Sequence, residues 1–365
     1  MTLPDISIAR EISQQIVETR FNTPNEIVTW MGAMQAQDFP MVKWAVSLRL
    51  PGSSEASIEA AMDKGEILRT HLLRPTWHLV AADDIHWMLG LTANRIKASM
   101  KSRDKELELD ETIYSKCNAL IQKALSGCKQ FTRDEIIAEI KIAGIATDNN
   151  RASHILMRAE LDGIVCSGAL KGNKQTYALL DERVPKTAII SREESLGKLA
   201  SRYFISHGPA SLNDFVWWSG LAVSDARIAL EMVKTDLISE IIGNETYWFR
   251  PTLKPINPDL NKVILLPAFD EFIISYKDRS ASLLLNDHKK AVSDNGIFRP
   301  VIMINGLVTG IWKRRFLKEK VIIETDFLRQ HTSSEKKQIE IEAAKYGLFL
   351  NKKAEVIFKN NADGK

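Results

Sequence analysis

The stretch 27-IVTWMGAMQAQDFPMVKW-44 contains two glutamines, Gln35 and Gln37, separated by a single alanine. The residues before them are apolar at helical spacing and predict an amphipathic helix. Pro40 disfavours helical geometry in the residue before it, and Asp38 is a good cap for a new helix that begins near this proline. We therefore expect both glutamines at a junction between two helices, where a break in the backbone can turn both amides to one side.

The Gln-x-Gln spacing is weak evidence when it is taken alone. Side chains two residues apart on a continuous helix point to nearly opposite sides, and a motif this short arises by chance. The competing interpretation is that the two amides cap the end of one helix and the start of the next. The rest of the chain has to decide between a functional pair and a pair of caps.

The composition is that of an ordinary soluble globular protein, with 365 residues of which 45% are hydrophobic and 26% charged. No apolar run approaches the roughly 18 residues of a membrane span. The first residues, Met-Thr-Leu-Pro-Asp-Ile, lack the basic and apolar regions of a signal peptide. We therefore expect a cytoplasmic protein that has no membrane partner.

The cysteines and histidines argue against several kinds of site. The three cysteines form no CxxC pair, and the seven histidines show no metal-ligand spacing. We therefore expect no disulfide framework, no metal site and no cofactor. The net charge of +3 permits a nucleic-acid partner without requiring one, so the clustering of the basic residues matters more than their number.

Helices followed by two strands recur three times along the chain, which is the order of elements in a winged helix. We predict an α+β fold with three tandem winged-helix modules over residues 1–107, 108–187 and 188–258. The first module carries the Gln-x-Gln element. After residue 258 the sequence favours β-strands, and we predict a β-rich C-terminal domain over 259–365.

The individual elements follow from periodicity, caps and turn residues. They are helices over 7–20, 25–36, 40–49 and 54–64, two strands within 67–80, helices over 133–143 and 149–161, strands over 164–168 and 175–180, helices over 193–206, 211–219 and 224–234, strands over 238–242 and 245–249, two strands within 263–276, a hairpin over 301–312, and a helix over 333–346.

Two groups of basic residues are candidates for contact with nucleic acid. Arg151, His154 and Arg158 form a polar stripe on a predicted helix, which either faces phosphates or is a solvated helix face. Between residues 285 and 320 there are eight Lys or Arg against three acids, and the run Lys313-Arg314-Arg315 follows directly on the predicted hairpin. A basic cluster beside three winged helices favours a nucleic-acid surface.

The layout resembles that of the AlkZ-like DNA glycosylases, a bacterial family of tandem winged helices, over nearly the whole chain. The pieces that match are Gln35-Ala36-Gln37, residues 74–80, residues 161–165, residues 265–271 with Tyr276 and Arg279, and the hairpin over 305–312. The resemblance implies that Gln35 and Gln37 are catalytic and that the modules form a concave DNA-binding channel. It also implies excision of N7-alkylated purines, or unhooking of interstrand crosslinks linked through guanine N7.

The implied chemistry suits two amides. A glutamine cannot act as an ordinary general base, but an N7-alkylguanine such as 7-methylguanine is already cationic and leaves without being protonated. The enzyme then has only to position a water and to stabilise an oxocarbenium-like sugar. No lysine is evident near the pair as a Schiff-base nucleophile, which predicts a monofunctional glycosylase.

The expected partner is double-stranded DNA that contains alkylated bases, bound by a monomer. For Trp77 the alternative to a place at the site is a place in the core, and the apolar run around Trp217 and Trp218 predicts that both belong to the core. The residues that we assign to DNA binding are His71, Arg74, Trp77, His78, Arg151, Arg158, Arg279, Lys313, Arg314 and Arg315.

A non-enzymatic winged-helix protein, either a transcription regulator or a lesion sensor, is the alternative function. Regulators usually combine one reading module with a ligand-binding or dimerisation domain. Three modules and a β domain fit a channel around DNA better, so the glycosylase is the preferred interpretation.

Overall fold

The computed structural model describes residues 1–252 and 262–359. Helices and strands are mixed along the chain, and the C-terminal part is rich in β-strands that form one sheet. This confirms the predicted α+β class. The predicted boundary at 258/259 lies outside the described residues. The division of the rest into separate winged-helix modules stays a prediction.

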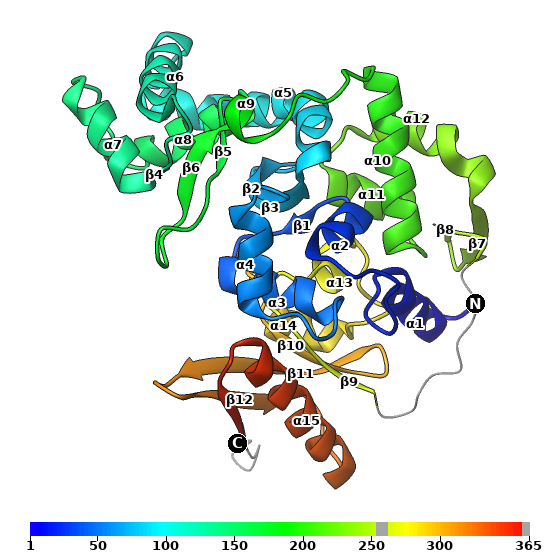
Figure 1. Cartoon of the computed structure of the whole chain (residues 1–365). Coiled ribbons are helices and arrows are strands. Elements are labelled where there is room, and N and C mark those ends of the chain that lie inside the picture. The colour runs from blue at the N-terminus through cyan, green and yellow to red at the C-terminus, as the bar shows by residue number, and fades with distance from the viewer. Residues whose placement is uncertain (253–261, 360–365) are drawn as a thin grey trace.

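The first unit contains the Gln-x-Gln element and a small antiparallel sheet of order β1-β3-β2. Its elements are α1 (Leu3–Ser13), α2 (Pro24–Met31), β1 (Met34–Gln35), α3 (Phe39–Leu48), α4 (Glu55–Asp63), β2 (Ile67–Leu72), β3 (Thr76–Ala81) and the long helix α5 (Ala82–Glu106). The last of these leads to the second unit, at the upper left of Figure 1.

The second and third units repeat the order of helices and hairpin. The second contains α6 (Glu111–Leu125), β4 (Phe131–Thr132), α7 (Arg133–Ile142), α8 (Arg151–Leu161), β5 (Val165–Ser167), β6 (Thr176–Leu179) and α9 (Leu180–Arg183), with sheet order β4-β6-β5. The third contains α10 (Arg192–His207), α11 (Leu212–Ser219), α12 (Val223–Val233), the 3-10 turn η1 (Lys234–Asp236) and the hairpin of β7 (Ile238–Ile242) and β8 (Glu245–Phe249).

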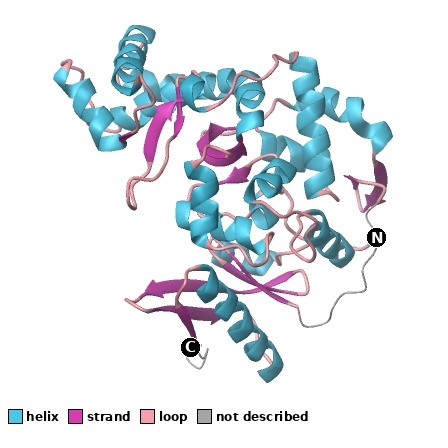
Figure 2. Cartoon of the chain, viewed as in Figure 1, coloured by secondary structure: helices cyan, strands magenta, loops and turns pink. Residues whose placement is uncertain are grey.

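The last unit is built on a mixed sheet of order β13-β12-β11-β10-β9, in which only the β12–β13 pair is parallel. Figure 2 shows these strands gathered at the lower end of the molecule. The elements are β9 (Val263–Leu266), α13 (Glu271–Ile274), η2 (Leu285–Asp287), α14 (His288–Ala291), β10 (Val301–Ile304), β11 (Leu307–Phe316), β12 (Lys320–Phe327), α15 (Ser333–Phe349) and β13 (Lys353–Phe358).

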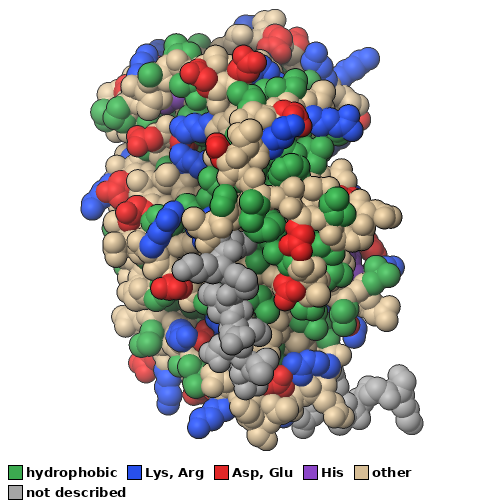
Figure 3. Space-filling view, turned by 90° about the vertical axis from the view of Figure 1, so that its right-hand side faces the viewer, with side chains coloured by type: hydrophobic (Ala, Val, Ile, Leu, Met, Phe, Trp, Pro, Cys, Tyr) green, Lys and Arg blue, Asp and Glu red, His purple; other side chains and the backbone are tan. Residues whose placement is uncertain are grey.

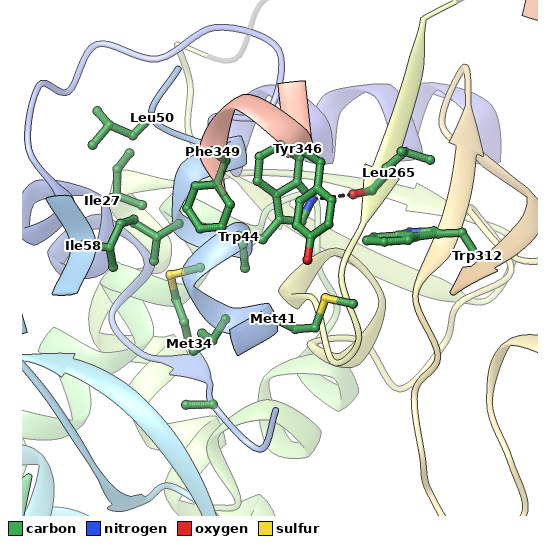
Figure 4. Packing of buried hydrophobic residues seen from close by; sticks show 14 of the residues in the cluster. Ile27, Met34, Met41, Trp44, Leu50, Ile58, Leu265, Trp312, Tyr346 and Phe349 are labelled. Atoms are coloured by element: carbon green, nitrogen blue, oxygen red, sulfur yellow. Dashed lines mark hydrogen bonds between the residues drawn. The ribbon is translucent and has the colours of Figure 1, made fainter. Parts of the chain in front are cut away.

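One of the two largest hydrophobic clusters joins the first unit to the last. Trp44 on α3 packs edge-on against Tyr346 on α15, with ring centroids 5.1 Å apart, and its indole nitrogen donates to the carbonyl of Leu265 at 2.9 Å. Trp312 on β11 packs against the same tyrosine, as Figure 4 shows. A second cluster joins the first unit to α10, α11 and α12, whereas α6, α7 and α8 pack in a cluster of their own. The Gln-x-Gln segment is thus held between units that share cores.

Several predicted boundaries are wrong, for local reasons. The helix expected over 7–20 begins at Leu3, where Thr2 and Asp5 form a capping box. The helix expected over 25–36 ends at Met31, because Gly32 has a φ of 77°, a conformation that residues with a side chain rarely adopt. The second strand expected within 263–276 is instead the short helix α13, which Asp270 caps.

Candidate active site around Gln35 and Gln37

Gln35 lies in the two-residue strand β1, between the end of α2 and the start of α3. It pairs with His78 of β3, and the backbone N–H of Ala36 donates to the carbonyl of Trp77 at 2.7 Å. The predicted junction between helices is therefore present. Gln37 follows the strand in a bend, so the two glutamines do not share a continuous helix and the objection that helical spacing places them on opposite sides does not apply.

The two amides differ in how they are held. Gln35 is buried, and its Oε1 accepts hydrogen bonds from the guanidinium of Arg74 at 2.9 Å and from the hydroxyl of Thr76 at 3.3 Å. Arginine can only donate, so the oxygen and not the nitrogen of the amide must face Arg74. This leaves the Gln35 NH₂ group without a partner among the described residues. Gln37 is exposed, and in the same part of the chain its side chain makes no hydrogen bond.

Glu271 lies directly behind Gln35 and is the main site residue that the sequence did not reveal. Its buried carboxylate accepts from the backbone N–H of Gln35, from the hydroxyl of Ser275 and from the indole of Trp218 at 3.2 Å. Burial opposes ionisation, but the nearby His207 ring and these donors outweigh it and hold the pKa of Glu271 at about 2. The ionised carboxylate thus fixes the backbone at Gln35, with contacts from three units.

Arg69, His71 and Trp77 support the same segment from the side. The Arg69 guanidinium lies 4.2 Å from the ring centroid of Trp77 and donates to the carbonyl of Ala36 at 3.0 Å. His71 lies against Trp77 at 4.5 Å and contacts Glu160 of α8 through Nδ1. Trp77 is half-buried, so it is neither wholly core nor wholly exposed. In this structure the three side chains contact other protein groups, and they border the site.

His78 is a buried neutral residue behind the site. Its Nδ1 bonds the carbonyl of Thr76 at 2.9 Å, and its Nε2 has no partner among the described residues. Burial, and then the positive charge of Arg74, lower the pKa of His78 to about 3. It is too deep for direct contact with DNA in this conformation.

His78 should make the protein less stable in mild acid. In the unfolded chain the ring takes up a proton below about pH 6.5, whereas in the folded protein it stays neutral down to about pH 3. The unfolded state therefore binds more protons in this window, and the free energy of unfolding falls as the pH falls, by about 1.4 kcal/mol per pH unit for this group. Urea unfolding at pH 6, 5 and 4 should show a slope that is smaller by about this amount in His78→Asn. Equal slopes in both proteins would contradict the assignment.

The polar stripe on α8 turns inward. Arg151 donates to the carbonyls of Ala146 and Leu107, and His154 contacts Asp104 at 2.8 Å. Arg158 forms ion pairs with Glu111 and Asp162. The stripe is therefore neither a free phosphate-facing surface nor a fully solvated face in this arrangement, because its charges are matched by groups of the second unit and by Asp104 near the end of α5.

The basic run on β11 stays at the surface. Lys313 and Arg315 are exposed, and Arg315 pairs with Glu324 at 3.4 Å. Arg314 is half-buried, and it reaches Asp38 at 3.4 Å and the hydroxyl of Tyr346 at 3.0 Å. Asp38 follows Gln37 directly, so Arg314, near the turn end of the β11–β12 hairpin, ties this hairpin to the Gln-x-Gln segment.

Arg279 lies on the same side as Arg74. Its Nε donates to the carbonyl of Ile273 at 3.0 Å, and its guanidinium lies 5.3 Å from the ring centroid of Trp217. Arg74 lies 5.6 Å from the same ring. Of the two adjacent tryptophans, Trp218 is a core residue as predicted, but Trp217 is only half-buried, which corrects the prediction that both belong to the core.

Charges of both signs are interspersed over the face in Figure 3, which forms no continuous basic patch among the residues drawn in colour. Within residues 1–252 and 262–359, no group of three or more His, Cys, Asp or Glu is placed to hold a metal ion. No helix in these ranges is long and apolar enough to cross a membrane.

Comparison with known proteins gives one consistent result. The family model described as DNA glycosylase AlkZ-like matches residues 28–349. An interstrand DNA cross-link repair glycosylase of Streptomyces sahachiroi is 21% identical over 329 residues, which cover 84% of this chain and 86% of that protein. The solved structure of Streptomyces sahachiroi DNA glycosylase AlkZ superposes with a TM-score of 0.79 at 19% identity, and covers 98% of this chain and all of that one.

Proposed function

This chain belongs to the AlkZ-like DNA glycosylase family and is therefore a DNA glycosylase, and we propose that it hydrolyses the N-glycosidic bond of cationic N7-alkylated purines in double-stranded DNA. Gln35 and Gln37 are the proposed catalytic pair. The non-enzymatic alternative, a regulator or a lesion sensor, has no support from the family match.

The observation that carries the proposal is the hydrogen bonding of Gln35. Its oxygen is held by Arg74 and Thr76, so the amide can offer only its NH₂ group to a ligand. Gln37 is unconstrained and can offer its oxygen. We assign to Gln37 the role of accepting a proton of the attacking water in a hydrogen bond, and to Gln35 the role of orienting that water. Arg74 polarises the Gln35 amide and strengthens it as a donor.

The surroundings support a lesion that needs no protonation. Glu271, which contacts the backbone of Gln35, is ionised and occupied by protein donors, so it is not a free general base, and Asp38 beside Gln37 is engaged with the Met41 N–H and Arg314. No lysine is hydrogen-bonded to either glutamine among the described residues, which supports a monofunctional reaction without a Schiff base. A positioning mechanism of this kind suits a base that is already a cationic leaving group.

Release of 7-methylguanine from a duplex with a single lesion tests the proposal. We expect abasic sites that alkali converts to strand breaks, no breaks before alkali, and no trapping of the protein on DNA by borohydride. A matched duplex with uracil should release no base, because uracil is a neutral and poor leaving group. Equal release of uracil, or no release of 7-methylguanine, would contradict the proposal.

Unhooking of crosslinks is a second activity to test, because the Streptomyces sahachiroi relative is named for interstrand cross-link repair. A duplex crosslinked through two guanine N7 atoms would show it as conversion to single strands on a denaturing gel. The hairpin of β11 and β12 is tied to the Gln-x-Gln segment through Arg314. Crosslinked and singly alkylated DNA should be compared in the same protein preparation.

A further inference from the structure

Trp217 is surrounded by positive charge at the edge of the candidate site. It lies in the last turn of α11, half-buried, and its indole nitrogen donates to the carbonyl of Ile274 at 2.7 Å. The Nζ of Lys277 lies 5.1 Å from its ring centroid, and the guanidinium carbons of Arg279 and Arg74 lie at 5.3 and 5.6 Å. One fixed aromatic ring therefore brings three cations together.

Among the described residues, these three cations have no carboxylate partner of the kind that the buried Arg10 and Arg49 have. Arg10 and Arg49 are paired with carboxylates, whereas Arg74, Lys277 and Arg279 form no ion pair within residues 1–252 and 262–359. In addition, Arg74 Nε and one terminal nitrogen of Arg279 are buried and have no hydrogen-bond partner in these ranges. Unmatched buried donors of this kind are costly unless a ligand satisfies them.

The carboxylates near the cluster are engaged with other groups, and Glu271, whose charge acts on Arg74, is occupied by the donors described above. Asp214 accepts the backbone N–H groups of Lys277 and Asp278 and pairs with Arg10. The Asp278 side chain accepts from the N–H and hydroxyl of Ser280. The acids near the cluster thus fix its backbone and act on Arg74 and Arg279 through charge at longer range, without a direct ion pair in the part of the chain that the structure describes.

An anion is the ligand that this arrangement fits. A cationic purine would be repelled by three positive charges, whereas a phosphodiester accepts from guanidinium and ammonium groups together. Arg74 also donates to the Gln35 oxygen at 2.9 Å, so the cluster borders the amide that we assign to the reaction. Stacking on a rigid tryptophan holds such cations in place before the ligand arrives.

We propose that Arg74, Lys277 and Arg279, held around Trp217, bind one backbone phosphate beside the lesion nucleotide and so set the position of its sugar relative to Gln35. The proposal rests on the proposed function. It adds a defined phosphate contact, in which Trp217 and Lys277 take part, to a general affinity for DNA.

Lys277 offers the clearest test, because its side chain is exposed and its removal should not disturb folding. For Lys277→Gln we expect duplex affinity to fall about 10-fold at low salt, and the slope of log K against log salt to decrease by about 1. Trp217→Leu keeps all three charges but removes their support, and it should also weaken binding. Lys337→Gln, which removes an exposed lysine on α15, is the control and should leave the slope unchanged.

The contacted phosphate can be located by neutralising each phosphate near the lesion in turn as a methylphosphonate. At one position the neutral linkage should weaken binding to the wild-type protein but have little further effect on Lys277→Gln, as expected when both changes remove one interaction. Additive effects at every position, or an equal change of slope in the control, would overturn the proposal. These experiments measure DNA binding, whereas the proposed function is tested by base release. A failure of the phosphate contact can therefore be distinguished from a failure of the proposed function.

Discussion

Gln37→Ala is expected to lower the rate of 7-methylguanine release by about 100- to 1000-fold, the usual effect of removing one preorganised polar group from a reacting centre. Gln35→Ala should have an effect of the same order. Gln37 is exposed and makes no hydrogen bond within the described part of the chain, so its removal should leave the free energy of unfolding nearly unchanged. Single-turnover rates with enzyme in excess would report the chemical step, and a binding assay on undamaged duplex would show that affinity is retained.

Substitution by glutamate separates the roles of the two amides. Gln35→Glu keeps oxygens for Arg74 and Thr76 but loses the NH₂ group, so it should be as inactive as Gln35→Ala. Gln37→Glu keeps an oxygen that can accept from water, so it should retain most of its activity. The reverse ranking would exchange the two roles.

Gln122→Ala is the matched control, because this glutamine is exposed on α6 and belongs to another unit. It should excise at the wild-type rate. If Gln35→Ala and Gln37→Ala also excise at that rate, the two amides are only helix caps and the reacting centre lies elsewhere. That outcome would favour the competing interpretation of the Gln-x-Gln spacing, in which the two amides are only caps.

The sequence predicted the elements whose signals are local. The hairpin of β7 and β8 was predicted with its observed bounds, because a Gly-Asn turn separates two short apolar runs. The helix α5 was not predicted, since its apolar residues face two different clusters and give no single stripe. The second strand expected within 263–276 is wrong because the β-branched residues there favour a strand. Asp270 caps a helix instead, and its role as a cap can be recognised only when the turn before it is known.

The candidate site was predictable only in part, because its geometry depends on residues far apart in the chain. The resemblance singled out Gln35 and Gln37 and included Glu271 in a matching piece, but gave Glu271 no role. Its contact with the backbone of Gln35 joins residues 236 positions apart, and no local pattern can reveal such a contact. The same limit applies to Trp217, whose apolar neighbours predicted a core residue although its own side chain is only half-buried.

Asp270→Ala is expected to be the most destabilising of the changes considered. Asp270 and Arg49 form a two-armed ion pair, with both oxygens 2.9 Å from guanidinium nitrogens, and both residues are buried. Removing the carboxylate leaves a buried cation without its partner, which costs about 3–5 kcal/mol in other proteins. Asp270 also caps α13 by accepting from the N–H of Phe272 at 2.8 Å, so a further ~1 kcal/mol should be lost. Urea unfolding at pH 7 would measure the sum.

The loss should also reach the candidate site, because α13 carries Glu271 against the backbone of Gln35. We therefore expect Asp270→Ala to excise more slowly even at temperatures where it is fully folded. The double variant Arg49→Leu with Asp270→Leu removes the unpaired charge and should recover part of the stability. It should not recover the rate, because the cap that positions Glu271 is still missing. Glu111→Ala breaks an exposed ion pair with Arg158 and should cost at most about 1 kcal/mol. If Asp270→Ala were as mild as Glu111→Ala, the buried pair would contribute little to the fold, and α13 would have to be held in place by its apolar contacts alone.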